Sequence, residues 1–323
     1  MNELLVFVCD GAPVRGEIIS LTSTWRAIQE RRHDHPVINR ILGEFVAAAA
    51  LLMASIKLDG TLIIQAQSKG PIRLLVIECN SQLTIRATVK MADNLPNIDS
   101  NSNLATLLDA EHSGRLVITL DPVNRQASQP PYQGIVALQH EIKGQLQPIQ
   151  TVAEAIMLYM QNSEQLETRI WLASSEKAVG GLLLQKMPDH GGTQTLALDP
   201  DLAIEGWNRI QTLGATITAD ELLSLSPETI LRRLFLEESH HYGVRSFPPR
   251  LVLFSCRCSR ERVADVLRMM GQEEVDSILE EQGSVTTHCD FCGAEYRFDP
   301  VDCKQVFISQ TLSDAVRPPS KGH

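Results

Sequence analysis

Aromatic side chains are scarce in this chain of 323 residues, at 5 % of the sequence, although 43 % of its residues are hydrophobic. This composition predicts a core built mainly from aliphatic side chains. Basic residues are also in deficit, since 29 Lys and Arg face 39 Asp and Glu, for a formal net charge of −10. Nucleic acids and anionic membranes attract basic surfaces, so we expect neither as a partner.

The chain also lacks a long hydrophobic run. The longest, residues 45–56, is interrupted only by Ser55 and is shorter than the ~20 residues that a helix needs to cross a bilayer. It predicts a buried helix instead. The N-terminus shows no basic stretch followed by a cleavable apolar segment, as a signal peptide would. We therefore expect a soluble cytoplasmic protein, in whose reducing surroundings paired cysteines are more often metal ligands or redox-active groups than permanent disulfides.

Motifs for nucleotide binding and hydrolysis are missing. The sequence contains no P-loop, no GxGxxG after an expected strand and no GxSxG. Such motifs provide a phosphate-binding backbone or an activated serine. We therefore expect that the protein is not an enzyme and that any covalent chemistry is thiol chemistry.

Short runs rich in β-branched residues mix with helical patterns over the first 188 residues. The expected strands are 3–8, 14–21, 61–67, 72–79, 83–89, 115–120, 134–139, 167–173 and 181–185. The expected helices are 22–32, 36–56 and 152–160. Strands and helices without regular alternation, joined by short links, favour an α+β fold with largely antiparallel sheets.

The character of the sequence changes near residue 188. Residues 199–240 carry only helical patterns, with Thr218 and Ser226 as good N-caps. These helices are short, and isolated helices below ~12–15 residues are marginal, so they must pack on a neighbour. We predict four parts: an α+β N-terminal domain (1–188), a helical linker (189–242), a small C-terminal domain (243–310) and a disordered tail (311–323).

Four of the seven cysteines form two tight pairs in the C-terminal domain. Cys256 and Cys258 form CxC, and Cys289 and Cys292 form CxxC after a gap covering residues 259–288. Two helical patterns fill this gap, and two short strands flank the CxxC as in a zinc knuckle. Four thiolates in two close pairs suit a tetrahedral Zn²⁺ ion. Structural zinc contributes an apparent ~10–16 kcal/mol to folding in small zinc peptides, so we expect the module to unfold when the metal is lost.

The same four cysteines could also form two disulfides, and spacing alone leaves a structural zinc site and a redox switch both open. Cysteines two positions apart can be bridged only near the long end of disulfide geometry, which favours a reversible bond over a permanent one. Cys303 is a nearby spare thiol that we expect to be packed in the module. Histidines at 240, 241 and 288 are expected to lie outside the metal site, and Cys9 and Cys79 read as small core residues.

Longer motifs point to a family. The CxC and CxxC pairs are accompanied by the following stretches: Cys258-Ser-Arg-Glu-Arg262, Glu273-Glu-Val-Asp-Ser-Ile-Leu279, Cys289-Asp-Phe-Cys-Gly293, Val14-Arg-Gly-Glu17, Leu42-Gly-Glu44, Gly70-Pro71, Tyr132-Gln-Gly134, Ser163-Glu-Gln-Leu166 and Gly180-Gly-Leu-Leu-Leu-Gln185. Over nearly its whole length the chain resembles the redox-regulated heat-shock protein 33 (33 kDa chaperonin) family.

The resemblance implies an N-terminal substrate-binding and dimerisation domain, a helical linker and a C-terminal zinc domain. It implies an ATP-independent holdase, inactive while reduced and zinc-bound, that captures unfolding client proteins after oxidation and dimerises when active. The implied Zn²⁺ ligands are Cys256, Cys258, Cys289 and Cys292, and the implied oxidised pairs are Cys256–Cys258 and Cys289–Cys292. Cys303 falls outside the family pattern.

Two other classes of function remain as hypotheses. A zinc-ribbon regulator would bind nucleic acid, but residues 243–310 carry eight Lys and Arg against eleven Asp and Glu, the opposite of the usual balance. A thiol-disulfide oxidoreductase would use the CxxC. That motif is expected between two knuckle strands, however, and not at the start of a helix in a βαβ unit.

Overall fold

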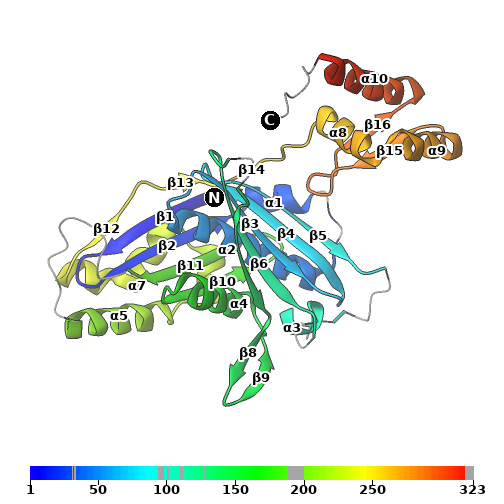
Figure 1. Ribbon diagram of the computed structural model, residues 1–323. Helices are drawn as coiled ribbons and strands as arrows, with labels where there is room; N and C mark the ends of the chain where they lie inside the picture. Colours follow the sequence, from blue (N-terminus) through cyan, green and yellow to red (C-terminus); the bar gives the residue numbers. More distant parts are fainter. Residues whose placement is uncertain are drawn as a thin grey trace, which may run out of the picture. The chain divides into compact units, whose positions relative to one another are not determined.

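The structure, a computed structural model, forms two compact units, residues Met1–Ser255 and Cys256–His323, which are described separately (Figure 1). The residues that it describes are 1–30, 32, 34–93, 98–99, 102–109, 112–126, 129–187 and 200–316. The expected start of the linker at 189 and the end of the expected tail, 317–323, lie outside these residues.

The first unit contains a six-stranded sheet that includes both ends of the unit. Its strands are β1 (Asn2–Cys9), β2 (Val14–Leu21), β10 (Thr168–Ser174), β11 (Val179–Lys186), β12 (Val244–Ser246) and β13 (Arg250–Leu251). The order is β10-β11-β2-β1-β12, and β13 also pairs with β1. All these pairs are antiparallel. We call this sheet A.

A second six-stranded sheet, sheet B, comes mostly from the middle of the unit. Its strands are β3 (Gly60–Gln67), β4 (Ile72–Asn80), β5 (Thr84–Met91), β6 (Arg115–Pro122), β7 (Tyr132–Ala137) and β14 (Leu253–Phe254), in the order β14-β5-β4-β3-β6-β7. Only β14 runs parallel to its neighbour. The expected α+β class with largely antiparallel sheets is therefore confirmed.

The helix α2 (Pro36–Ser55) forms the centre of the first unit and contacts strands of both sheets. Pro36 suits the first turn of a helix because its missing N–H has no partner there anyway. Residues 45–51 are completely buried, and the small side chains of Ala47–Ala50 let both sheets approach closely. This helix is long and apolar enough to cross a membrane, but 83 % of the relevant stretch is buried inside the protein, as in the core helix that the sequence predicted.

Smaller elements complete the rim of the first unit. They are α1 (Ser23–Gln29), α3 (Leu104–Leu107), α4 (Val152–Tyr159), a π-helical turn (Met160–Glu164) and the hairpin strands β8 (Gln139–Ile142) and β9 (Gln145–Pro148). The hairpin of β8 and β9 projects away from the sheets (Figure 1). The sequence predicted one strand over 134–139, whereas β7 ends at Ala137 and a second strand begins at Gln139.

Three helices cover the face of sheet A opposite α2: α5 (Pro200–Gly214), α6 (Ala219–Ser224) and α7 (Pro227–His241). Side chains alternate between the two faces of a strand, so Ile19 lies in the core around α2 while Ile18 lies under the three helices. The expected caps are present, since the side chains of Thr218 and Ser226 accept backbone N–H groups at the starts of α6 and α7. The short helices thus pack on a neighbour, as predicted.

The second unit contains α8 (Arg260–Met270), α9 (Gln272–Gln282), β15 (Val285–His288), β16 (Glu295–Phe298) and α10 (Pro300–Val316). Its core is small and consists of Ala264, Leu267, Val275, Val285, Phe298, Cys303 and Val306. The sequence predicted both short helices and both knuckle strands but not α10.

The limits of the second unit differ from those expected for the C-terminal domain. Residues 244–254 were expected in that domain, but they contain β12, β13 and β14. The strands β12 and β13 pair with β1 in sheet A, and β14 pairs with β5 in sheet B. At the other end, α10 continues to Val316 through part of the expected disordered tail. Asp299 and Asp302 explain where α10 begins, because each carboxylate accepts the backbone N–H of the other, a reciprocal cap of the kind that starts helices.

Candidate metal centre

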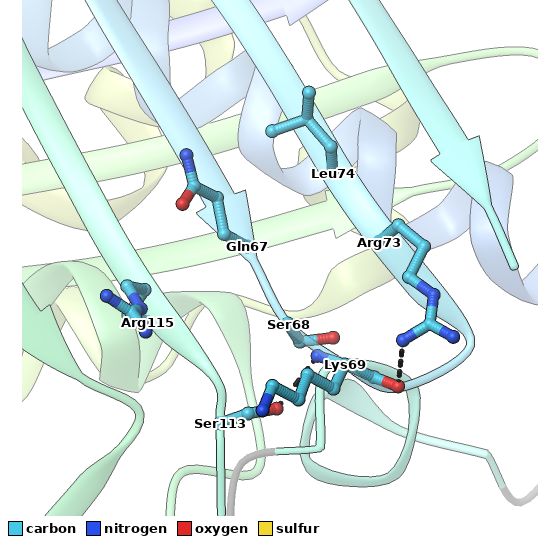
Figure 2. Close-up of a pocket in the computed structure, with 7 residues that line it drawn as sticks. All are labelled: Gln67, Ser68, Lys69, Arg73, Leu74, Ser113 and Arg115. Atoms are coloured by element: carbon cyan, nitrogen blue, oxygen red, sulfur yellow. Dashed lines mark hydrogen bonds between the residues drawn. The ribbon is translucent and has the colours of Figure 1, made fainter.

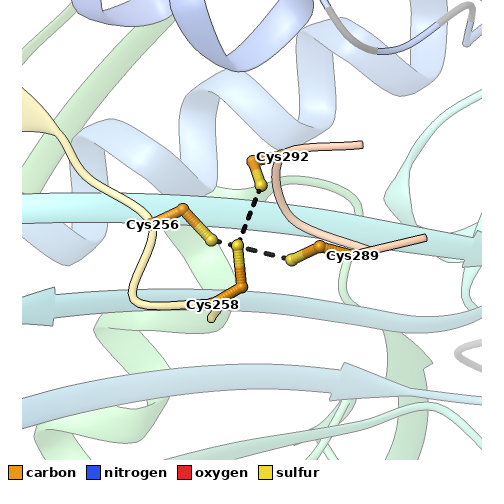
Figure 3. A group of neighbouring side chains, drawn as sticks. All are labelled: Cys256, Cys258, Cys289 and Cys292. Carbon is orange, nitrogen blue, oxygen red and sulfur yellow. Dashed lines mark hydrogen bonds between the residues drawn. The ribbon is translucent and has the colours of Figure 1, made fainter. Parts of the chain in front are cut away.

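The four cysteines of the CxC and CxxC motifs come together in the second unit. Cys256 and Cys258 lie in the segment before α8, and Cys289 and Cys292 lie in the turn between β15 and β16. The four Sγ atoms all lie within 4.8 Å of one another (Figure 3). A gap of thirty residues is closed because α8 and α9 fold back and return the chain to its starting point.

The sulfur distances fit ligands around one ion. Cys256 Sγ lies 3.6 Å from Cys289 Sγ, and Cys258 Sγ lies 3.3 Å from Cys292 Sγ. A disulfide bond would need about 2.0 Å, so all four cysteines are free thiols. Sulfurs bound ~2.3 Å from a tetrahedral zinc ion lie about 3.8 Å from one another. The described residues thus provide a donor set of the type and size that zinc requires.

The turn that carries Cys289 and Cys292 is fixed by its own backbone. The N–H of Cys289 donates to Ala294 O at 2.9 Å, and the N–H of Gly293 donates to Cys289 O at 2.8 Å. Gly293 has a φ of 67°, a left-handed conformation that glycine adopts without a Cβ penalty. Both sulfurs of the CxxC motif are thereby directed to the same side of the turn.

Burial and hydrogen bonds affect the thiols of Cys256, Cys289 and Cys292 differently. Burial acts to raise the pKa of Cys256, but hydrogen bonds from the N–H of Cys258 and from the neighbouring thiols outweigh it and lower that pKa to about 7. Burial raises the pKa of Cys292 to about 12 and also raises that of Cys289. Four thiolates so close together repel one another, so a cation is needed to hold all four deprotonated.

Contacts around the centre tie α8 to the strands and to α10. The guanidinium of Arg260 lies 4.1 Å from the centroid of the Phe298 ring, donates to Arg297 O at 2.7 Å and pairs with Asp302 at 2.7 Å. The hydroxyl of Tyr296 hydrogen-bonds to Cys258, which raises the pKa of this tyrosine to about 12. Neither Arg260 nor Tyr296 was predicted as part of the site, because one arginine or tyrosine among many carries no local signal.

In the described part of the chain, the candidate metal-binding group contains only Cys256, Cys258, Cys289 and Cys292. Cys303 is 2 % exposed and lies in the core of the second unit, and burial raises the pKa of its thiol. Cys9 and Cys79 are buried in the first unit, where burial raises the pKa of each to about 12. His288 faces Glu295, 3.3 Å away. The prediction that Cys9, Cys79 and Cys303 are packed in the protein interior is confirmed.

Known proteins are similar to this chain in sequence. A family model described as "Hsp33 protein" matches residues 2–299. A 33 kDa chaperonin from Methylobacillus flagellatus is 44 % identical over 313 residues, which cover 96 % of each chain. A 33 kDa chaperonin from Chromobacterium violaceum is 41 % identical over 314 residues, 97 % of this chain and 96 % of that protein.

A solved structure supports the fold. The crystal structure of the 33 kDa chaperonin of Thermotoga maritima, a heat shock protein 33 homologue, superposes with a TM-score of 0.71 over 97 % of this chain and 100 % of that one, at 19 % identity.

The two sheets around a central helix, the covering helices and the small four-cysteine unit define a class of α+β proteins with a candidate C-terminal metal centre. Within that class, the chain belongs to the Hsp33 family.

Proposed function

We propose that this protein is a redox-regulated, ATP-independent holdase chaperone that acts in the cytoplasm on unfolding proteins. The observation that carries the proposal is the cluster of four free thiols within 4.8 Å in a unit with a small core. Membership of the Hsp33 family supports the chaperone part of the proposal, and the chemistry of the cluster supports the redox part. The similar proteins are named chaperonins, which agrees with a role in binding other proteins. We propose no enzymatic reaction.

In the reduced state, Cys256, Cys258, Cys289 and Cys292 would hold one Zn²⁺ ion as thiolates. Zinc would provide the positive charge that lets four thiolates coexist, and so would connect the segment before α8 to the β15–β16 turn. The buried residues that the structure describes in the second unit, seven in number, form too small a core to fold with a large margin. The metal would therefore keep this unit folded and the chaperone inactive.

In the oxidised state, we propose disulfides between Cys256 and Cys258 and between Cys289 and Cys292. Each bond forms from two thiolates that lose two electrons, and peroxide or hypochlorite accepts them and is reduced to water or chloride. Across the two motifs, Cys256 Sγ lies 3.6 Å from Cys289 Sγ and Cys258 Sγ lies 3.3 Å from Cys292 Sγ, so pairing between the motifs is the alternative. Disulfide mapping by mass spectrometry tests it, and a Cys258–Cys292 peptide as the main product would overturn this pairing.

The surface exposed by activation would lie under α5, α6 and α7. These helices cover apolar side chains of sheet A, among them Phe7, Ile18 and Leu182, which are completely buried. The Phe7 ring packs against Phe235 of α7 at a centroid distance of 5.3 Å. We propose that residues 1–188 bind clients and dimerise, that 189–242 are the releasable linker, and that 243–310 are the switch. Loss of the second unit would weaken the linker and expose this surface to clients.

Light scattering of a client that aggregates on heating tests the function. Reduced, zinc-loaded protein should leave aggregation unchanged, and peroxide-treated protein should suppress it at near-stoichiometric ratios, with zinc released and four thiols lost. A variant with serine at 256, 258, 289 and 292 should no longer respond to oxidant, whereas Cys303→Ser should still respond. Equal suppression by reduced and oxidised protein would sink the switch, and size-exclusion chromatography of both forms tests the proposed dimer.

The two other hypotheses gain no support from the site. The CxxC turn lies between β15 and β16, whereas oxidoreductases place this motif at a helix N-terminus. A nucleic-acid regulator would require binding that weakens steeply with salt. A gel-shift titration at low salt checks it directly.

A further inference from the structure

A basic pocket of ≈340 Å³ lies on the outer face of sheet B, at the end where β3 turns into β4 (Figure 2). Its polar lining consists of Gln67, Ser68, Lys69, Arg73, Ser113 and Arg115. Pockets for organic ligands span ~300–1,000 Å³, so this one suits a small ligand. It is remote in the sequence from the cysteine cluster and serves no part of the function proposed above.

Strand register explains why the cations meet. Gln67 pairs with Arg115 on one side and with Leu74 on the other, so these side chains lie in one row on the face opposite α2. The turn at the end of β3 adds Lys69, and the start of β4 adds Arg73. Three positive groups from three segments thus surround one hollow.

Hydrogen bonds fix the turn and leave donors of its cations available. The Arg73 guanidinium folds back and donates to the carbonyl of Lys69 (Figure 2), which leaves its other N–H groups for a ligand. Ser113 Oγ accepts the N–H of Lys69 at 2.8 Å. Ser68 Oγ donates to Ile72 O at 2.6 Å and accepts the N–H of Gly70 at 2.9 Å. The site is therefore ordered before any ligand arrives.

Within the part of the chain that the structure describes, none of Lys69, Arg73 and Arg115 lies within ion-pair distance of a carboxylate, although acidic residues outnumber basic ones by ten. The positive charge of Lys69 helps to lower the pKa of Asp109. The Asp109 carboxylate, however, accepts a hydrogen bond from Ser113 Oγ and lies 3.1 Å from His112 Nδ1. An unpaired basic cluster in an acidic protein is an attractive site for an anion.

We propose that this pocket binds a small oxyanion of the phosphate class that carries more than one negative charge. Arginine presents a planar fork of donors that matches two oxygens of a phosphate, and lysine adds a point charge. A ligand with one carboxylate carries a single negative charge and would leave most of the charge of the three cations unbalanced. The ligand is either free phosphate or pyrophosphate or the terminal phosphates of a nucleotide.

Isothermal titration of the full-length, reduced, zinc-loaded protein tests the proposal at low ionic strength, because salt screens exposed charges. Phosphate, pyrophosphate and ADP are titrated separately. We expect saturable binding of one pyrophosphate per chain, more tightly than phosphate. ADP that binds more tightly than pyrophosphate assigns the site to nucleotides, and ADP that binds no more tightly assigns it to the free oxyanion.

Variants distinguish a site from diffuse attraction. Arg73→Gln and Arg115→Gln should each weaken pyrophosphate binding at least about tenfold, or ~1.4 kcal/mol, while Arg115→Lys should lose less because it keeps the charge. Lys143→Gln, at the exposed turn after β8, is the matched control and should bind like the parent. These arginines are exposed, so circular dichroism should find every variant folded. No saturable binding, or equal loss in Lys143→Gln, overturns the proposal.

Discussion

Glu238 of α7 and Arg209 of α5 form an ion pair that joins two of the helices covering sheet A. The Glu238 side chain is only 4 % exposed, and both of its oxygens accept N–H groups of the Arg209 guanidinium. The same guanidinium lies 4.5 Å from the centroid of the Tyr242 ring. The covering helices are thus held to each other by charge as well as by apolar contacts, which makes this pair a place to test whether they can be released.

Glu238→Gln should loosen the covering helices. Removing one partner of a buried ion pair typically costs ~3–5 kcal/mol, but Arg209 is 28 % exposed and keeps access to water, so we expect about 1–3 kcal/mol here. In this variant, amide hydrogen exchange should accelerate more in α5 and α7 than in α2. Glu237→Gln, on the exposed side of the same helix, is the control. Unchanged exchange in α5 and α7 would show that apolar contacts alone hold them.

Zinc removal should unfold the second unit and leave the first intact. The core of the second unit is small, and metal binding in such modules provides most of the folding free energy. After chelation, NMR should show loss of dispersed signals from residues 256–316 and retention of those from the two sheets. If the second unit keeps its dispersed signals without metal, the switch proposed above has no physical basis.

Cys303→Ala should change stability but not metal binding. The thiol is buried in the core of the second unit, so losing it leaves a small cavity that costs about 1 kcal/mol. Zinc content should stay at one ion per chain, whereas Cys292→Ala should lose it. Atomic absorption together with a thiol titration checks both variants. Loss of zinc from Cys303→Ala would mean that this sulfur contributes to the centre.

Glu17→Gln should change the pH dependence of stability. Burial raises the pKa of the Glu17 carboxyl to about 7, although the Arg15 guanidinium, 2.6 Å away, acts to lower it. The folded state therefore binds more protons than the unfolded state between about pH 4.5 and 7, and this group makes the protein less stable as pH rises through that range.

The measurement is the free energy of unfolding in urea at pH 5 and pH 8. The glutamine side chain does not ionise, so the variant avoids the cost of a buried carboxylate above pH 7. Its stability relative to the parent should therefore rise by about 1–3 kcal/mol from pH 5 to pH 8. Glu176→Gln, on an exposed loop, should show no such trend. A parallel pH dependence in parent and Glu17→Gln would mean that Arg15 keeps the carboxylate ionised in the folded protein.

The local elements followed from the sequence because their signals are local. The β-branched runs predicted β2 and the strands β3 to β6 of sheet B, and Thr218 and Ser226 marked the starts of α6 and α7. Pairing between distant segments was not predicted, because β12 and β14 are too short to carry a pattern of their own. Their pairing with β1 and β5 places these strands in the first unit, and the second unit begins at Cys256.

The sequence by itself determined the four thiols, because the spacing of Cys256, Cys258, Cys289 and Cys292 already matched a tetrahedral ligand set. It also determined the mixed fold class and the dependence of the short helices on a neighbour. Only the tertiary structure decided which groups from distant segments meet: Arg209 with Glu238, and Arg115 with Lys69 and Arg73. The reason is that ligand spacing and helix caps act over a few residues, whereas these meetings depend on strand register and helix packing, which exist only once the whole chain has folded.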